Sequence, residues 1–154
     1  MFDLSQLSLV NRALDCWNAG RTKEAAGLLG VNTDCPSLDA DALFGNPFTR
    51  LAVYGSLAPG KSNHYMLAHL RGGWHLATTH GILKDQGWGA ATGFPALVWD
   101  PSGPAIAVQV LESPDLPGYW KILDDFEGGD YRRILITVVA GEGVEVANLY
   151  AAAP

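Results

Sequence analysis

The chain has 154 residues, a length typical of a single domain with a substantial hydrophobic core. Hydrophobic residues make up 48% of it and charged residues 17%, which indicates a globular protein rather than a disordered one. Sixteen acidic and ten basic residues give a net charge of −6, which argues against a broad basic surface for nucleic acid or an anionic membrane.

The sequence also lacks the usual signals for secretion, membrane insertion and disulfide bonding. Its N-terminus has no basic segment followed by an apolar run, and no apolar stretch reaches the roughly 18 residues of a membrane span. Two cysteines, Cys16 and Cys35, are too few for a disulfide framework or a metal site. We therefore expect a soluble cytoplasmic protein that binds neither nucleic acid nor membrane, and no oligomeric state is predicted.

The first fifty residues read as a helical extension. Apolar residues recur three or four positions apart between Leu4 and Trp17, which predicts an amphipathic helix that Gly20 ends. Thr22 is placed to begin a second helix, which ends at Gly30. One such pair is too short for a solenoid, which needs about three repeats, so we expect a packed or docking helical hairpin. Prolines at positions 36 and 47 mark a junction, and we divide the chain into residues 1–49 and 50–154.

The remaining chain is rich in glycine and proline and contains short apolar runs that predict strands. These runs cover residues 51–54, 74–83, 96–99, 105–111, 134–139 and 144–150. Two helices are expected, over residues 63–70 and 116–126, because their apolar side chains share one helical face. Many short strands with few helices predict an α+β fold, in which a small mixed β-sheet closes into a barrel-like core with helices packed outside.

The segment from Gly55 to Ser62 also satisfies the phosphate-loop pattern G-x-x-x-x-G-K-[ST]. Lys61 and Ser62 then stand where a nucleotide phosphate and a magnesium ion would bind. A phosphate-loop fold needs repeated βαβ units, however, and the segments after Asp100 are typical of hairpins broken by glycine and proline. Nucleotide binding is therefore the weaker alternative.

Glu127 ends an apolar helical segment immediately before Gly128 and Gly129, residues that favour helix termination. A carboxylate at a helix C-terminus meets the negative end of the helix dipole, and apolar neighbours remove water from it. Both effects should raise its pKa, as a general base working near neutral pH requires. The alternative is a solvated acidic helix end shared with Asp124 and Asp125.

An ordered set of segments resembles the gamma-glutamylcyclotransferase-like family. The set comprises Tyr54-Gly55-Ser56-Leu57, then Gly60 and Asn63, Gly81, Phe94-Pro95-Ala96-Leu97, and Leu123-Asp124-Asp125-Phe126-Glu127-Gly128 with Tyr131 and Arg133. The resemblance covers roughly residues 51–150 and leaves residues 1–49 outside it. One departure is Ala107, which stands where the family pattern has glycine.

The resemblance implies an intramolecular aminolysis. The α-amine of a small-molecule gamma-glutamyl amide attacks its own γ-carbonyl, which releases 5-oxoproline and a free amine. Glu127 would be the catalytic base, and the substrate would contact Tyr54, Gly55, Ser56, Leu57 and Tyr131. No metal or cofactor is expected, because proximity supplies much of the rate of such a reaction.

Several residues and one further function class complete the expectations. His64, His69, His75 and His80 lack the i,i+4 spacing of a helical zinc pair, and the aspartates at 124, 125 and 130 are expected to be solvated. Tyr131 and Arg133 either brace the Glu127 loop or touch substrate. Trp88 and Trp99 are expected to fill the core rather than to line a pocket, which is the alternative. A non-catalytic ligand- or partner-binding module of the same fold is the alternative to an enzyme.

Overall fold

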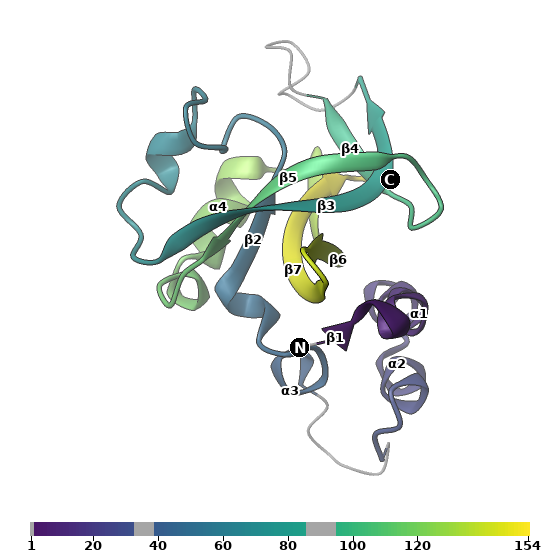
Figure 1. Cartoon of the computed structure of the whole chain (residues 1–154). Coiled ribbons are helices and arrows are strands. Elements are labelled where there is room, and N and C mark those ends of the chain that lie inside the picture. The colour runs from purple at the N-terminus through teal and green to yellow at the C-terminus, as the bar shows by residue number, and fades with distance from the viewer. Residues whose placement is uncertain (1, 33–38, 86–94) are drawn as a thin grey trace.

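The computed structural model describes residues 2–32, 39–85 and 95–154. The expectations for Cys35, Pro36, Trp88 and Phe94 therefore lie outside the described residues. Figure 1 shows strands wrapped around a common centre, with helices on the outside and the N-terminal helices gathered at one end.

Five strands close into a ring, as the sequence predicted. They are β2 (Arg50–Val53), β3 (Gly73–Lys84), β5 (Ala105–Glu112), β6 (Tyr131–Ala140) and β7 (Gly143–Ala152). β5 pairs antiparallel with β2 and β3, β3 pairs with β6, and β6 forms a hairpin with β7. The ring closes where β7 pairs in parallel with β2 through Asn148 and Leu51. The mixed barrel is thereby confirmed.

Two further strands extend this ring. β4 (Ala96–Trp99) adds to β3, and β1 (Phe2–Asp3), which was not predicted, adds to β7. β4 approaches β3 so closely that a Cβ atom on Gly81 would lie 2.4 Å from the carbonyl oxygen of Val98. Any larger residue at position 81 would push β4 away from β3.

The strands alternate between the barrel interior and its outer face, as period-2 patterning requires. On β2, Ala52 packs inside with Val110, Ile136 and Leu149, whereas its neighbour Leu51 packs outward against other elements. Small interior residues such as Ala52 and Ala147 allow a barrel of this size to fill itself with side chains. The helices pack against the outer face of the barrel.

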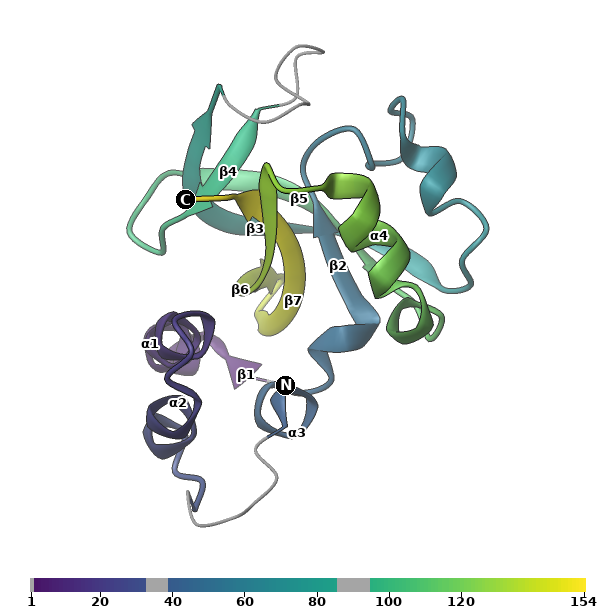
Figure 2. The ribbon, with the colours of Figure 1, turned by 180° about the vertical axis from the view of Figure 1, so that it is seen from behind.

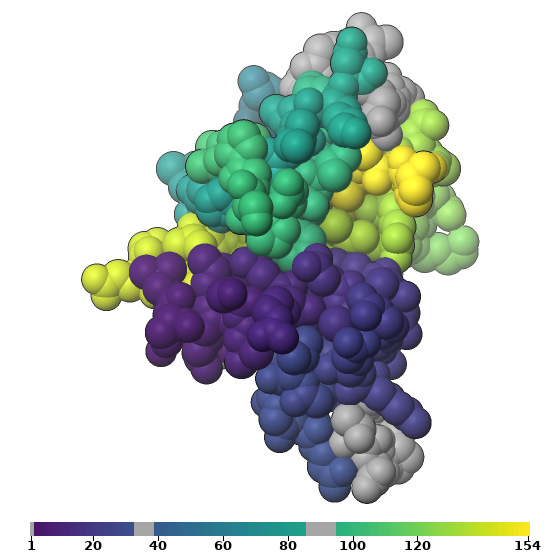
Figure 3. Space-filling view, turned by 90° about the vertical axis from the view of Figure 1, so that its right-hand side faces the viewer, coloured from purple at the N-terminus to yellow at the C-terminus, as the bar shows by residue number. Residues whose placement is uncertain are grey.

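The N-terminal helices α1 (Leu7–Asn18) and α2 (Thr22–Leu28) confirm the predicted hairpin, and a short α3 (Ala40–Phe44) follows. Leu14 and Phe44 share an apolar cluster with Leu135 and Val146 of the barrel. Asn18 donates from Nδ2 to the Leu135 carbonyl (2.8 Å) and accepts from the Leu135 N–H (3.1 Å). α1 lies against β6 of the barrel and α2 packs against α1, and Figures 2 and 3 show these helices gathered at one end of the molecule. The division between residues 49 and 50 stays a prediction.

The predicted helix over residues 63–70 is wrong. Only a single 3-10 turn forms there, over His64–Met66. The side chains of Asn63 and His64 bond back to Ser56 and Leu57, so the segment folds onto the preceding loop. These tertiary bonds outweigh the weak helix preference of a segment this short.

The predicted helix over residues 116–126 is shorter and displaced. A 3-10 turn covers Leu116–Gly118, and α4 runs from Trp120 to Glu127. Pro117 and Gly118 explain the break, because proline fits only a first turn and glycine is a poor helix former. α4 packs on the outer face of β2 through Leu123 (Figure 2).

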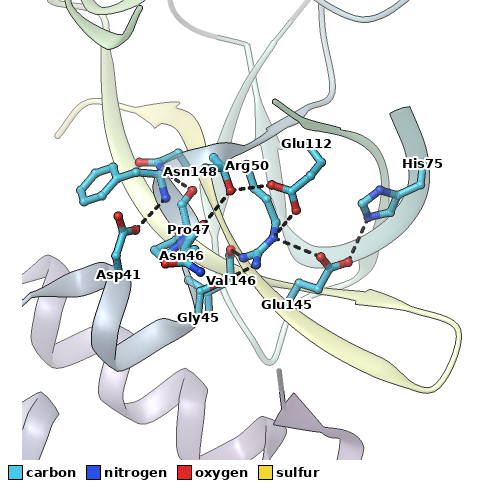
Figure 4. Close-up of polar contacts among 12 residues, drawn as sticks. Asp41, Gly45, Asn46, Pro47, Arg50, His75, Glu112, Glu145, Val146 and Asn148 are labelled. Atoms are coloured by element: carbon cyan, nitrogen blue, oxygen red, sulfur yellow. Dashed lines mark hydrogen bonds and ion pairs between the residues drawn. The ribbon is translucent and has the colours of Figure 1, made fainter. Parts of the chain in front are cut away.

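An ionic cluster around the buried Arg50 fastens the start of β2 (Figure 4). Arg50 is 8% exposed and its Nε lies 2.9 Å from Glu112 and 3.1 Å from Glu145, and Nη1 donates to the Val146 carbonyl. Glu145 also meets His75 of β3 at 3.0 Å. Because β3 and β6 share a single residue pair, the His75–Glu145 contact helps to hold β3 against β7.

Candidate active site

A cavity opens where β2 ends, on the opposite end of that strand from Arg50. The space between its lining residues, counted together with the mouth that opens to solvent, is about 410 Å³. All six residues predicted for the site line it: Tyr54, Gly55, Ser56, Leu57, Glu127 and Tyr131. Further lining comes from Ala52, Val53, Pro95 and Tyr150, of which Tyr150 had no role in the sequence prediction.

Glu127 is the last residue of α4 and is 7% exposed. Trp120, Leu123 and Glu127 lie three and four positions apart, so the face that buries the apolar pair also turns the carboxyl group inward. Burial raises the pKa of Glu127 from 4.5 to about 7. The carboxyl group therefore exchanges its proton near neutral pH.

Gly128 makes this placement possible. Its φ of 73° is positive, as predicted for the residue after the helix, but its ψ of −166° lies outside the left-handed helical region. Only glycine adopts this combination readily, and it turns the chain sharply away after the carboxyl group. The chain then enters β6 at Tyr131, whose side chain returns to the cavity.

The loop of Gly55, Ser56 and Leu57 faces Glu127 with its backbone amides available. Each of its three carbonyls accepts a hydrogen bond: from the Ala58 N–H (3.1 Å), from the Asn63 N–H (2.8 Å) and from His64 Nδ1 (3.0 Å). Within residues 2–32, 39–85 and 95–154, the N–H groups of these three loop residues donate to no acceptor. A run of free N–H groups at one cavity is a site for an anionic oxygen.

The hydroxyl groups of Tyr54 and Tyr150, at the cavity wall, are hydrogen-bonded within the protein. The Tyr54 hydroxyl donates to the Tyr150 carbonyl (2.8 Å) and accepts from the Leu97 N–H (2.9 Å). The Tyr150 hydroxyl donates to Asp124 Oδ1 (2.6 Å). Burial raises the pKa of both tyrosines, so each stays protonated and forms a wall of the cavity.

Arg133 braces α4. Its guanidinium bonds Asp124 through Nε (2.9 Å) and Nη2 (3.3 Å), bonds the Asn148 side chain, and stacks 4.5 Å from the Trp120 ring. Burial alone would raise the pKa of Asp124, but the bonds from Arg133 and Tyr150 outweigh it and hold that pKa below its ordinary value. Of the two roles open for Arg133, the structure favours bracing, whereas Tyr131 lines the cavity.

The features of a nucleotide site are not assembled. Lys61 and Ser62 are exposed, and β2 lies in a closed barrel rather than a parallel sheet. The α-helix that should follow a phosphate loop is replaced by one 3-10 turn. Phosphate binding would need that helix N-terminus together with the loop.

The structure separates the other candidates for metal binding. His64, His69 and His75 contact Leu57, the Tyr119 ring and Glu145 respectively, at different places on the fold. In the part of the chain that the structure describes, no three His, Cys, Asp or Glu side chains converge on one point. Likewise, none of the described helices has the length and apolar character needed to cross a membrane.

The structure also places the other residues that the sequence analysis singled out. Trp99 is half-buried: it packs against both the helical cluster and the barrel interior, and it also lines a separate surface pocket. Ala107, which departs from the family pattern, is exposed on β5 and does not line the cavity. Pro95 and Leu97 of the family-like segment both serve the site, one as lining and one as the donor to Tyr54.

Comparison with known proteins identifies related structures. YkqA from Bacillus subtilis is 28% identical with a TM-score of 0.54, over 68% of this chain and 35% of YkqA, so the chain spans about a third of that protein. An aig2-like protein from Mus musculus is 25% identical with a TM-score of 0.53, over 68% of this chain and 77% of the mouse protein. An Arabidopsis thaliana protein, 22% identical with a TM-score of 0.50 over 67% of each chain, supports the fold alone.

Curated proteins gave no significant match to this chain. The family model described as gamma-glutamyl cyclotransferase, AIG2-like, matches residues 51–154. That range contains the barrel from Leu51 onward, the loop of Gly55, Ser56 and Leu57, and Glu127. The chain therefore belongs to the gamma-glutamyl cyclotransferase, AIG2-like family.

Proposed function

We propose that this protein converts a gamma-glutamyl amide into 5-oxoproline and a free amine. The observation that carries the proposal is a buried carboxyl group, with a pKa raised to about 7, in the same cavity as three backbone amides that donate to no acceptor among the described residues. The first group suits proton transfer near neutral pH, and the second suits an anionic oxygen. Family membership supplies the reaction that needs both.

Glu127 is assigned the proton transfers. Its carboxylate removes a proton from the substrate α-ammonium, and the resulting amine attacks the γ-carbonyl carbon of the same molecule. The new C–N bond closes a five-membered ring, and the carbonyl oxygen becomes negative. When the ring intermediate collapses, the original amide C–N bond breaks and the leaving nitrogen takes the proton from Glu127. The carboxylate is thereby restored. The second proton of the ring nitrogen passes to the released amine, which leaves as an ammonium ion.

The loop residues are assigned to substrate holding. The amides of Gly55, Ser56 and Leu57 would receive either the α-carboxylate or the developing oxyanion, since both carry negative oxygen. Tyr54 and Tyr131 would form the walls that keep the γ-glutamyl chain folded. Folding the chain brings the amine to its carbonyl, and this proximity accounts for a large part of the rate.

The test is a panel of gamma-glutamyl amides that differ in the joined amine. The joined amine is an amino acid, the dipeptide part of glutathione, the side-chain amine of lysine or a simple alkylamine. Release of 5-oxoproline is followed by chromatography and mass spectrometry, with and without chelator. The control substrate carries an acetyl group on its α-nitrogen, so it binds without an attacking amine. At least one panel member should be turned over and the acetylated control should not. A folded protein that binds panel members without turnover would instead be a non-catalytic module.

A further inference from the structure

The Asn63 side chain and backbone both return to Ser56. The Asn63 N–H donates to the Ser56 carbonyl (2.8 Å), and its Nδ2 donates to the Ser56 hydroxyl oxygen (2.9 Å). Ser56 is 8% exposed, whereas Lys61 and Ser62 on the same loop are exposed. Two bonds to one residue, one on its backbone and one on its side chain, fix the direction of the Ser56 side chain.

That direction determines where the hydroxyl proton points. A serine hydroxyl has one proton and two lone pairs. The amide of Asn63 occupies one lone pair and, through Nδ2, offers only a donor, so the hydroxyl proton must point elsewhere. Across residues 2–32, 39–85 and 95–154, Ser56 Oγ donates to no acceptor, and Ser56 lines the cavity. The proton is therefore available to a molecule in the cavity.

We infer that the Ser56 hydroxyl donates a hydrogen bond to an anionic oxygen of the gamma-glutamyl group, and that Asn63 is the positioning residue that aims it. This role rests on the proposed function and adds a side-chain donor to the three loop amides. The oxygen is either the developing oxyanion or the α-carboxylate, which share the same chemistry. Asn63 cannot accept the hydroxyl proton through Nδ2, so it orients Ser56 without activating it as a nucleophile.

The experiment compares turnover by the wild-type protein with that of Ser56→Ala, Ser56→Thr, Asn63→Ala and Asn63→Asp. Removal of one oxyanion donor lowers kcat about 10²–10³-fold, so Ser56→Ala should fall in that range. Ser56→Thr keeps the hydroxyl and should remain close to the wild type. Asn63→Asp should match Ser56→Ala, because a carboxylate at position 63 accepts the hydroxyl proton and draws it away from the cavity.

A double-mutant cycle separates positioning from a merely structural role. If Asn63 acts through the hydroxyl, the double variant with alanine at both positions should lose no more activity than Ser56→Ala alone. Ser62→Ala, an exposed serine on the same loop, is the matched control and should be unchanged. A loss confined to kcat assigns the oxygen to the oxyanion, and a rise in KM assigns it to the α-carboxylate.

Two results overturn the inference while the wild type is active. They are a folded Ser56→Ala variant with kcat and KM within about twofold of the wild type, and additive losses in the cycle. Circular dichroism and thermal melting establish that each variant is folded. A wild-type protein that turns over no member of the panel defeats the proposed function itself, and the role of Ser56 with it.

Discussion

Glu127→Gln tests the proposed base with the smallest change in shape. Glutamine keeps the volume and the acceptor oxygen of the side chain but cannot take up a proton at neutral pH. Positioned proton transfer contributes about 10²–10⁴-fold, so kcat should fall at least about a hundredfold. KM should change little, because the amides of Gly55 and Leu57 hold the substrate. The wild-type kcat/KM should fall about tenfold per pH unit below pH 7, because the base is progressively protonated.

The same substitution has a predicted effect on stability. The folded-state pKa of Glu127 is raised from 4.5 to about 7, so the protonated form stabilises the fold fully below pH 4.5. That contribution is lost as the pH rises through 7, where the buried carboxyl group ionises. The full loss is about 3–4 kcal/mol, because the pKa rises from 4.5 to about 7 and a tenfold change in proton affinity is worth about 1.4 kcal/mol. Glu127→Gln does not ionise, and should therefore be more stable than the wild type at pH 8 and similar to it at pH 4.

The assay measures 5-oxoproline release between pH 5 and pH 9 and denaturant unfolding at pH 4 and pH 8. Asp125→Asn is the matched control, because Asp125 is an exposed carboxylate two positions away that pairs with Lys121. It should leave both profiles unchanged. A Glu127→Gln variant with near wild-type turnover would remove Glu127 from the mechanism. A variant less stable than the wild type at pH 8 would show that the ionised carboxylate stabilises the fold.

Three further expectations follow from the structure. Arg133→Ala should lower stability by about 1–3 kcal/mol and reduce kcat, because Asp124 loses its partner beside Glu127; unchanged unfolding and turnover would dismiss the bracing role. Because Lys61 is exposed, Lys61→Ala should leave the thermal midpoint and turnover unchanged. Calorimetry that shows Mg-ATP binding to the wild type and none to Lys61→Ala would contradict this. A chain beginning at Asn46 should lose several kcal/mol or aggregate, because Leu135 and Val146 lose their cover, each worth about 1.5–3 kcal/mol; a soluble chain with unchanged unfolding would refute this.

The barrel strands were predictable because they are short apolar runs bounded by glycine and proline. That pattern lies within each strand and does not depend on which strand it pairs with. The position of Glu127 at a helix end was predictable for a similar reason, since helix periodicity and the following glycines are local signals, whereas its role in the site was predicted from the family resemblance. The pairing of β2 with β7 was not, because it is parallel and joins residues 51 and 148. Tyr150 was missed for the same reason: only that pairing brings it to the cavity.

The segment after Gly60 failed as a prediction because its polar side chains serve tertiary contacts. Met66, Leu67 and Leu70 satisfy the spacing of a helix face, but Asn63 and His64 bond to the loop that precedes them. An asparagine seven residues after a serine gives no periodic signal, although its side chain can satisfy backbone and hydroxyl groups in turns. The signal in the sequence was the glycine at position 60, which allows the chain to reverse with a φ of 80°.

These loop bonds bear directly on the chemistry. Because each carbonyl of Gly55, Ser56 and Leu57 is bonded to the segment that follows, the backbone of the loop is held in place at the cavity before a substrate arrives. Donors that are already oriented stabilise developing charge without a cost of reorganisation during the reaction. On the other side of the cavity, Arg133 and Asp124 hold the end of α4, so that Glu127 is fixed relative to the same loop. The absence of the expected helix and the order of the proposed anion site thus have one cause, because the side chains after Gly60 bond to the preceding loop instead of forming a helix of their own.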